Sequence, residues 1–150
     1  AWVADNGLTL HPDKTRLVDA TRPGGFDFLG YHFERGQKWP RRKALDRFKD
    51  KVRERTPRSS GESMEATIAS LNDMLRGWFG YFKHSSRDRL DGLDSYIRGR
   101  LRSILRKRMG RRGRGRGYDH QRWRNHYFDE LGLFSLTRAH VSARLSPQGV

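Results

Sequence analysis

The residues best suited to binding chemistry form a series of cations in the second half of the chain. No aspartate or glutamate occurs between Arg98 and Arg116. Neighbouring cations on a helix repel one another unless a polyanion offsets their charge. The series therefore predicts phosphate contacts with a nucleic acid, with simple solvation of an exposed helix face as the alternative. The candidate residues are Arg98, Arg100, Arg102, Arg106, Lys107, Arg111, Arg112, Arg114 and Arg116.

Two further cations, Arg76 and Lys83, lie close to Gly77 and Gly80 in a helical segment. In a helix interior each glycine costs about 1 kcal/mol relative to alanine. A missing side chain permits close approach of a backbone, either of a second helix or of a nucleic acid strand. Arg76 and Lys83 are therefore further candidates for RNA contact, with a core helix and a weakened exposed face as the alternative. Trp78 lies on the apolar arc and is assigned to the core rather than to base stacking.

The rest of the sequence offers no catalytic or metal-binding constellation. There is no cysteine, which excludes disulfides and thiolate metal sites. The six histidines include no pair four residues apart, so a zinc site is not expected. Aspartates in the first part of the chain are scattered, and no glycine-rich loop is followed by Lys-Ser/Thr. We therefore expect no metal and no cofactor in this chain.

Composition points to a polyanionic partner. The 150 residues are enough for one domain or two small ones, and their formal net charge is +15 at pH 7. Such a charge favours nucleic acid, with an acidic membrane surface as the competing partner. We see no signal peptide and no stretch that could span a bilayer, so we expect a cytoplasmic protein with no membrane partner. Because the sequence opens on Ala1, in what reads as the end of a helix, we expect a fragment of a longer protein.

Helical periodicity organises most of the chain. After the potential cap Ser63, apolar residues recur at steps of four and three, which predicts an amphipathic helix. The predicted helices are 41–55, 63–85, 86–109 and 119–131. The predicted strands are 15–20 and 26–33, joined as a hairpin by a turn at 22–25. Residues 34–42 read as a polar connector, 109–117 as a mobile basic loop, and no helix is predicted after residue 131.

The expected fold class is therefore mainly α, a small helical bundle preceded by a β-hairpin. The hairpin region is expected to occupy residues 1–36 and the bundle residues 37–109. Residues 110–150 would hold the basic loop and a C-terminal helical segment.

Several segments resemble one known family. Residues 7–33, GLTLHPDKTRLVDATRPGGFDFLGYHF, resemble the end of the palm in reverse transcriptases encoded by group II introns. Leu71-Asn72, Leu75-Arg76-Gly77-Trp78 and Tyr81-Phe82 resemble the signature of that family's maturase-specific, or X, domain. Residues 93–102 continue the pattern as Leu-Asp-x-Tyr-Ile-Arg-x-Arg-Leu-Arg, and residues 130–136, ELGLFSL, are similar to its closing segment.

The resemblance implies an α-helical thumb and X domain behind a remnant of the palm sheet. Its implied partners are group II intron RNA, whose folded form it would stabilise during splicing, and the duplex of RNA template and DNA primer. The resemblance also makes Phe28-Leu29-Gly30-Tyr31 similar to the primer grip, which positions the primer end. Lys14 matches a palm lysine that can act as general acid toward the departing pyrophosphate, with a surface lysine contacting phosphate as the alternative.

The family's catalytic Tyr-x-Asp-Asp loop, which binds Mg²⁺, would lie before Ala1. We therefore expect no polymerisation by this chain alone. The alternatives to a maturase are a non-specific basic RNA-binding scaffold fragment, a piece of a polymerase whose catalytic half is another chain, and a basic membrane-surface module. Whether the chain forms a homodimer is left open by the sequence.

Overall fold

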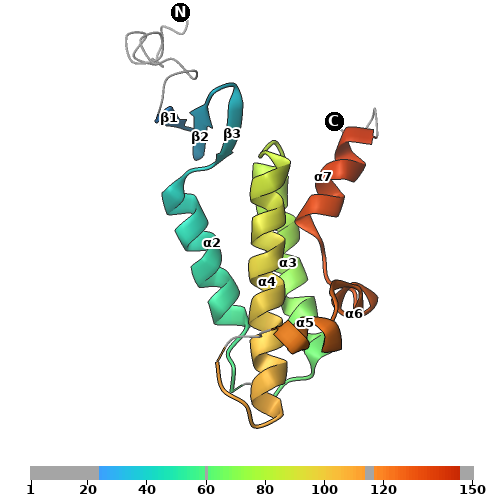
Figure 1. Ribbon diagram of the computed structural model, residues 1–150. Helices are drawn as coiled ribbons and strands as arrows, with labels where there is room; N and C mark the ends of the chain where they lie inside the picture. Colours follow the sequence, from blue (N-terminus) through green and yellow to red (C-terminus); the bar gives the residue numbers. More distant parts are fainter. Residues whose placement is uncertain (1–23, 60, 114–116, 146–150) are drawn as a thin grey trace, which may run out of the picture.

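The computed structural model describes residues 24–59, 61–113 and 117–145. A three-stranded antiparallel sheet precedes a bundle of helices (Figure 1). This arrangement confirms the expected mainly α fold, with a small hairpin-type sheet before the helices. The strands are β1 (Phe26–Phe28), β2 (Tyr31–Glu34) and β3 (Gln37–Pro40). The helices are α2 (Arg42–Arg55), α3 (Met64–Phe82), α4 (Arg87–Arg108), α5 (Gly117–Arg122), α6 (Asn125–Glu130) and α7 (Leu136–Leu145).

The sheet is a meander stabilised by cross-strand aromatic pairs. Phe26 of β1 lies opposite Phe33 of β2, and their rings stack with centroids 5.2 Å apart. His32 of β2 lies opposite Trp39 of β3, again with ring centroids 5.2 Å apart. The N–H of Ser86 donates a hydrogen bond to a carbonyl of β3 at 2.8 Å, which ties the sheet to the start of α4. A small sheet that is only marginal alone is thus supported by the bundle.

The strand predicted over 26–33 is wrong in its length, because a turn divides it at Leu29-Gly30. These residues have φ angles of 53° and 83°, and a two-residue hairpin turn needs positive φ at both positions. The connector predicted over 34–42 is also wrong, since Arg35-Gly36, with φ of 52° and 79°, forms a second turn that leads into β3. Leucine and arginine rarely adopt positive φ, so the residue types did not indicate these turns. The strand predicted over 15–20 lies outside the described residues.

Three long helices, α2, α3 and α4, enclose the core. The helices predicted over 41–55, 63–85 and 86–109 are confirmed to within a few residues at each end. Ser63 caps α3, because its Oγ accepts a hydrogen bond from the N–H of Ala66 at 3.1 Å. The buried side chains of these helices include Phe48, Val52, Ile68, Leu71, Leu75, Leu90, Ile97, Leu101 and Ile104. Trp78 packs against this core as predicted, with its ring centroid 4.6 Å from those of Phe48 and Phe82.

The C-terminal part departs from the prediction of one helix over 119–131. Two short helices, α5 and α6, are separated there by Trp123 and Arg124. The carbonyl of Trp123 accepts a hydrogen bond from Nε of Arg102 at 2.8 Å. The N–H of Tyr127 donates instead to the carbonyl of Arg124 at 2.9 Å. The Arg102 side chain of α4 thus occupies the Trp123 carbonyl, which would accept from the N–H of Tyr127 in a continuous helix.

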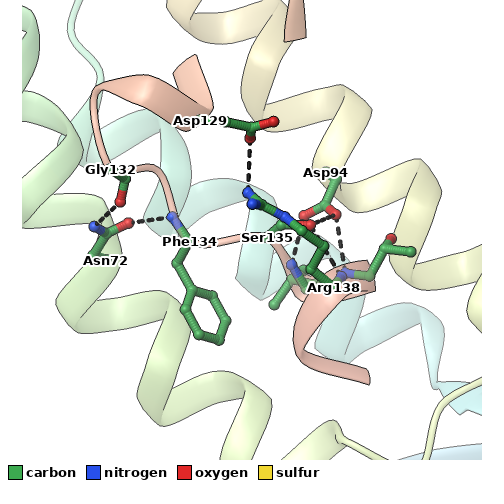
Figure 2. Close-up of polar contacts among 9 residues, drawn as sticks. Asn72, Asp94, Asp129, Gly132, Phe134, Ser135 and Arg138 are labelled. Carbon is green, nitrogen blue, oxygen red and sulfur yellow. Dashed lines mark hydrogen bonds and ion pairs between the residues drawn. The ribbon is translucent and has the colours of Figure 1, made fainter. Parts of the chain in front are cut away.

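Helix α7, which was not predicted, is held by a buried carboxylate of α4. Asp94 is only 4% exposed. It accepts hydrogen bonds from Ser135 Oγ at 2.9 Å, Leu136 N–H at 2.9 Å and Thr137 N–H at 3.0 Å (Figure 2). The first N–H groups of a helix have no intrahelical partner and carry partial positive charge. The Asp94 carboxylate, from a distant part of the chain, accepts hydrogen bonds from these N–H groups and offsets their partial positive charge.

Asn72 fastens α3 to the loop that precedes α7. Although its side chain is polar, Asn72 is only 7% exposed. Its Nδ2 donates to the carbonyl of Gly132 and its Oδ1 accepts from the N–H of Phe134, both at 2.8 Å (Figure 2). Because both the nitrogen and the oxygen of the side-chain amide are hydrogen-bonded, its burial costs little free energy.

We expect Asp94→Ala to lower the free energy of unfolding by about 3 kcal/mol, because buried N–H groups of α7 lose their acceptor. The amide protons of Leu136 and Thr137 should also exchange faster with solvent, which hydrogen-exchange NMR measures beside urea unfolding. The matched control is Asp91→Ala, which removes an exposed carboxylate from the same helix. It should change the unfolding free energy by less than about 0.5 kcal/mol. Equal effects of the two substitutions would contradict the anchoring role of Asp94.

Candidate nucleic-acid interface

Arg102, predicted to contact phosphate from an exposed helix face, lies inside the protein. It is 4% exposed, so the expectation of an exposed position is wrong. Its Nε donates to the carbonyl of Trp123 at 2.8 Å, and its Nη2 to Asn125 Oδ1 at 2.9 Å. Its guanidinium lies 5.3 Å from the ring centre of Phe128. Burial lowers the pKa of Arg102, and the neighbouring charge of Arg98 lowers it further.

Arg100 and Arg106 are half-buried and also hold neighbouring segments. The Nε and Nη2 of Arg100 donate to Oγ1 and the carbonyl of Thr56, at 3.1 and 2.8 Å. The Nη1 of Arg106 lies 2.6 Å from Oδ2 of Asp119, a carboxylate that is 1% exposed as a residue. The Nε of Arg106 donates to the carbonyl of Arg112 at 2.7 Å. These arginines therefore fasten the ends of loops to α4, and only their remaining donors are open to a phosphate.

The other predicted cations of α4 and the following loop lie nearer the surface. Lys107, Arg111 and Arg112 are exposed, and Arg98 is half-buried. RNA contact by these side chains stays a prediction. The predicted residues that lie outside the described part of the chain are Lys14, Arg114 and Arg116.

The exposed face of α3 is open around its two glycines. A Cβ added at Gly77 or Gly80 would meet no described atom within 4 Å, so neither glycine makes room for a second helix. Arg76 is exposed with its guanidinium 5.8 Å from the ring centre of Phe134, while Lys83 is half-buried at the helix end. RNA contact by Arg76 and Lys83 also stays a prediction.

A cavity of about 470 Å³ lies between the β1–β2 turn, α2 and α3. The turn is fixed to α3 by Tyr81, whose hydroxyl donates to the carbonyl of Leu29 at 2.6 Å. The Tyr31 hydroxyl donates in turn to the carbonyl of Tyr81 at 2.9 Å. Leu29 is 68% exposed and Tyr81 is 56% exposed, so apolar surface borders the cavity. Of the four residues compared with a primer grip, Leu29, Gly30 and Tyr31 lie against α3, and Phe28 precedes them at the end of β1. Their role with a primer stays a prediction.

The cations of α2 were not among the predicted RNA contacts, yet they line this cavity. Three cations line it beside aromatic side chains: Arg41, which precedes α2, and Arg47 and Lys51, which belong to α2. Arg47 and Lys51 are exposed and lie one helical turn apart. Their i, i+4 spacing in a basic helix was visible in the sequence and could have indicated the site. The aromatic lining consists of Phe48, Trp78, Tyr81 and Phe82. Cations beside aromatic rings suit phosphate contact together with stacking.

Comparison with protein families shows to which family the chain belongs. A family model described as "Group II intron, maturase-specific domain" matches residues 45–127, more than half of the chain. The chain belongs to this family. A search among curated proteins finds no match.

The segment matched by the family model begins inside α2 and ends inside α6. It therefore contains Asn72, Asp94 and Arg102, the buried polar residues that hold the C-terminal segment. It also contains Arg47 and Lys51 of the cavity, whereas the β1–β2 turn precedes it and α7 follows it. Within the described residues no helix is both long and apolar enough to cross a membrane. No cluster of three or more acidic or histidine side chains in that part of the chain could hold a metal ion.

In the maturase-specific domain we expect Arg102→Met to lower the free energy of unfolding by about 2 kcal/mol, because the carbonyl of Trp123 and the side chain of Asn125 lose their donor. Lys107→Gln removes an exposed cation of the same helix and should change this free energy by less than about 0.5 kcal/mol. Urea unfolding followed by circular dichroism measures both. Similar stabilities of the two variants would contradict the structural role of Arg102.

The sheet that precedes the maturase-specific domain carries a pH-sensitive group. Nε2 of His32 lies 3.0 Å from a carboxylate oxygen of Glu34, and Nδ1 lies 2.6 Å from one of Asp27. Hydrogen bonds to Glu34 and then to Asp27 raise the pKa of His32 above its usual value. Protonated His32 therefore stabilises the sheet below about pH 6.5, and this stabilisation is lost as the pH rises through the folded-state pKa.

We expect His32→Gln to lower the melting temperature at about pH 5 and to have little effect at about pH 9. The exposed His126 provides the control, because it faces one carboxylate at 3.5 Å rather than two at hydrogen-bond distance, and His126→Gln should show a smaller difference between the two pH values. An effect of His32→Gln that is the same at both pH values would argue against the proton linkage.

Proposed function

We propose that this chain is the RNA-binding maturase region of a group II intron reverse transcriptase. In this role it binds intron RNA to assist splicing, and it holds the RNA template and DNA primer duplex during RNA-directed DNA synthesis. The observation that carries the proposal is the family match over residues 45–127. The matched segment includes most of the cations and aromatic rings that line the cavity between α2 and α3.

The charge of the chain supports an RNA partner. Its net charge is +15, and α2 alone exposes six cations, namely Arg42, Lys43, Arg47, Lys51, Arg53 and Arg55. Neutralising phosphates with such side chains releases counterions, which supplies much of the affinity of proteins for nucleic acid. The carboxylates of α2 offset only part of this charge, because the helix holds three acidic and seven basic residues, RKALDRFKDKVRER.

The cavity beside the β1–β2 turn supports the template–primer role. The turn is held by the Tyr81 hydroxyl at a defined position against α3, and rigid placement is what a primer-positioning element needs. Arg41, Arg47 and Lys51 line the same cavity and could neutralise the phosphates of a duplex end. The resemblance of the turn to the primer grip leads to the same assignment.

Strand synthesis is not assigned to this chain alone. The Tyr-x-Asp-Asp motif that the resemblance implies for Mg²⁺ does not occur in the 150 residues. The proposed contribution is therefore binding and positioning, with the Mg²⁺ held by the catalytic palm.

A non-specific basic RNA-binding scaffold fragment is the second candidate function. The same exposed cations favour it, because phosphate contacts carry no sequence information. The two candidates differ in whether group II intron RNA is preferred over other structured RNA.

A binding titration with a structured group II intron RNA and an unrelated structured RNA of equal length tests the proposal across several salt concentrations. We expect the affinity for both RNAs to fall steeply with salt, because phosphate contacts release counterions. The intron RNA should keep an advantage of about tenfold or more, which corresponds to about 1.4 kcal/mol. Equal affinities would leave only the scaffold function, and the absence of RNA binding would reject both candidates.

Two charge-matched double variants serve as controls in this titration. Arg47→Gln with Lys51→Gln should weaken binding of the intron RNA and lower its salt slope by roughly 2, since two phosphate contacts are lost. Arg124→Gln with Arg144→Gln removes the same charge from exposed positions on α7 and before α6 and should have a smaller effect. Equal losses would show that total charge, rather than the cavity, sets the affinity.

A further inference from the structure

A groove separates α2 from α4 on the side of α2 that faces away from the hairpin cavity. It consists of two hollows of about 620 and 480 Å³, both lined by residues of α2 and α4. Lys49 and Tyr96 line both hollows, so the two adjoin one another along the helices.

The first hollow, at the β3 end of the groove, contains two aromatic rings with cations beside them. The guanidinium of Arg89 lies 4.2 Å from the ring centre of Trp39, and Nζ of Lys49 lies 5.3 Å from that of Tyr96. Both rings line the hollow and are only partly buried. Asp88 is the acidic residue among its described lining. Aromatic rings and cations in one groove are the combination that binds unpaired nucleic acid strands.

The second hollow is lined by cations and hydroxyl groups, with no carboxylate among its described lining residues. Its cations and histidine are Lys49, Arg53, Arg58, Arg100, Arg102 and His120. Burial lowers the pKa of Arg100, and the positive charges of Arg58 and Arg53 lower it further. Asp50 offsets part of this charge, because its Oδ1 lies 2.6 Å from Nη1 of Arg53. The remaining cations repel one another, and a bound phosphate would offset that repulsion.

The floor of the groove contains two glycines of α4, one in each hollow. Gly92 lines the first hollow and Gly99 the second, and a Cβ added at either would meet no described atom within 4 Å. Glycine is among the poorest helix formers, yet packing within this chain does not require it at these positions. The two glycines keep the α4 side of the groove free of side chains.

We propose that the groove between α2 and α4 binds an unpaired RNA strand. Bases stack on Trp39 and Tyr96, and a backbone phosphate lies among the cations around Arg100. Paired bases are stacked inside their helix and cannot reach rings in a groove, so the aromatic lining selects a single strand over a duplex. The inference rests on the proposed RNA-binding function and adds to it the class of RNA that this surface recognises.

Filling the groove tests the proposal without removing a contact from the fold. Gly92→Gln with Gly99→Gln places side chains in both hollows, while Gly92→Ala with Gly99→Ala makes the same gain in helix propensity with little added volume. We expect the glutamine pair to bind a fluorescent unpaired RNA oligonucleotide at least tenfold more weakly than the unchanged 150-residue chain. The alanine pair should bind it normally, and both pairs should bind an RNA duplex as the unchanged chain does. Circular dichroism melting confirms that each variant is folded.

A second pair of variants keeps the test valid if the glutamine pair does not fold. Arg53→Gln with Arg58→Gln removes two exposed cations from the second hollow. It should lower the salt slope for unpaired RNA by roughly 1.4, at about 0.7 for each phosphate contact on a single strand. Arg138→Gln with Arg144→Gln removes equal charge from exposed positions of α7, which lies on the other side of α4 from α2 (Figure 1), and should leave this slope nearly unchanged.

The outcomes separate this inference from the proposed function. If the unchanged chain binds unpaired RNA and the groove variants bind it equally well, the groove is not the site and the maturase proposal stands. If the groove variants lose duplex binding to the same extent as single-strand binding, selection of an unpaired strand is overturned. If the unchanged chain binds no RNA of either kind, both the inference and the proposed function are rejected.

Discussion

The contact on which the C-terminal half depends is that between the Asp94 carboxylate and the first turn of α7. Neither group could be buried alone, because an unpaired carboxylate and free helix N–H groups are both costly to remove from water. Together they satisfy each other, with Ser135 completing the hydrogen bonds. Asn72 acts in the same way on the preceding loop. These contacts hold the chain after α6 against α3 and α4, together with the core packing of Leu133 and Leu136.

The strongly basic composition does not produce a uniformly basic surface. Arg102 and Arg106 make hydrogen bonds inside the protein, where they hold α5 and α6 against α4. A buried guanidinium is tolerated there because its planar fork of donors meets carbonyl and carboxylate oxygens in fixed positions. Only the cations that the fold leaves exposed are therefore available to a partner. Many of them lie on α2 and the loops beside it, rather than along α4.

Helix α2 has a central place in this arrangement because it presents cations on both sides of one apolar stripe. Phe48 and Val52 point into the core. At about 100° per residue, Arg47 and Lys51 flank this stripe on one side, and Lys49 and Arg53 flank it on the other. The first pair lies at or beside the cavity near the β1–β2 turn, and the second lines the groove shared with α4. One short amphipathic helix thus separates a site beside the hairpin from a groove along the bundle.

The sequence by itself determined the three long helices, the mainly α fold and the family. Those features depend on the local spacing of apolar residues and on short motifs such as that of Leu71, Asn72 and Trp78. Only the tertiary structure decided the break at Trp123, the existence of α7 and the burial of Asp94 and Arg102. The physical reason is that each of these depends on a hydrogen bond between residues far apart in the chain. A polar residue outside the apolar periodicity reads as exposed until its distant partner is known.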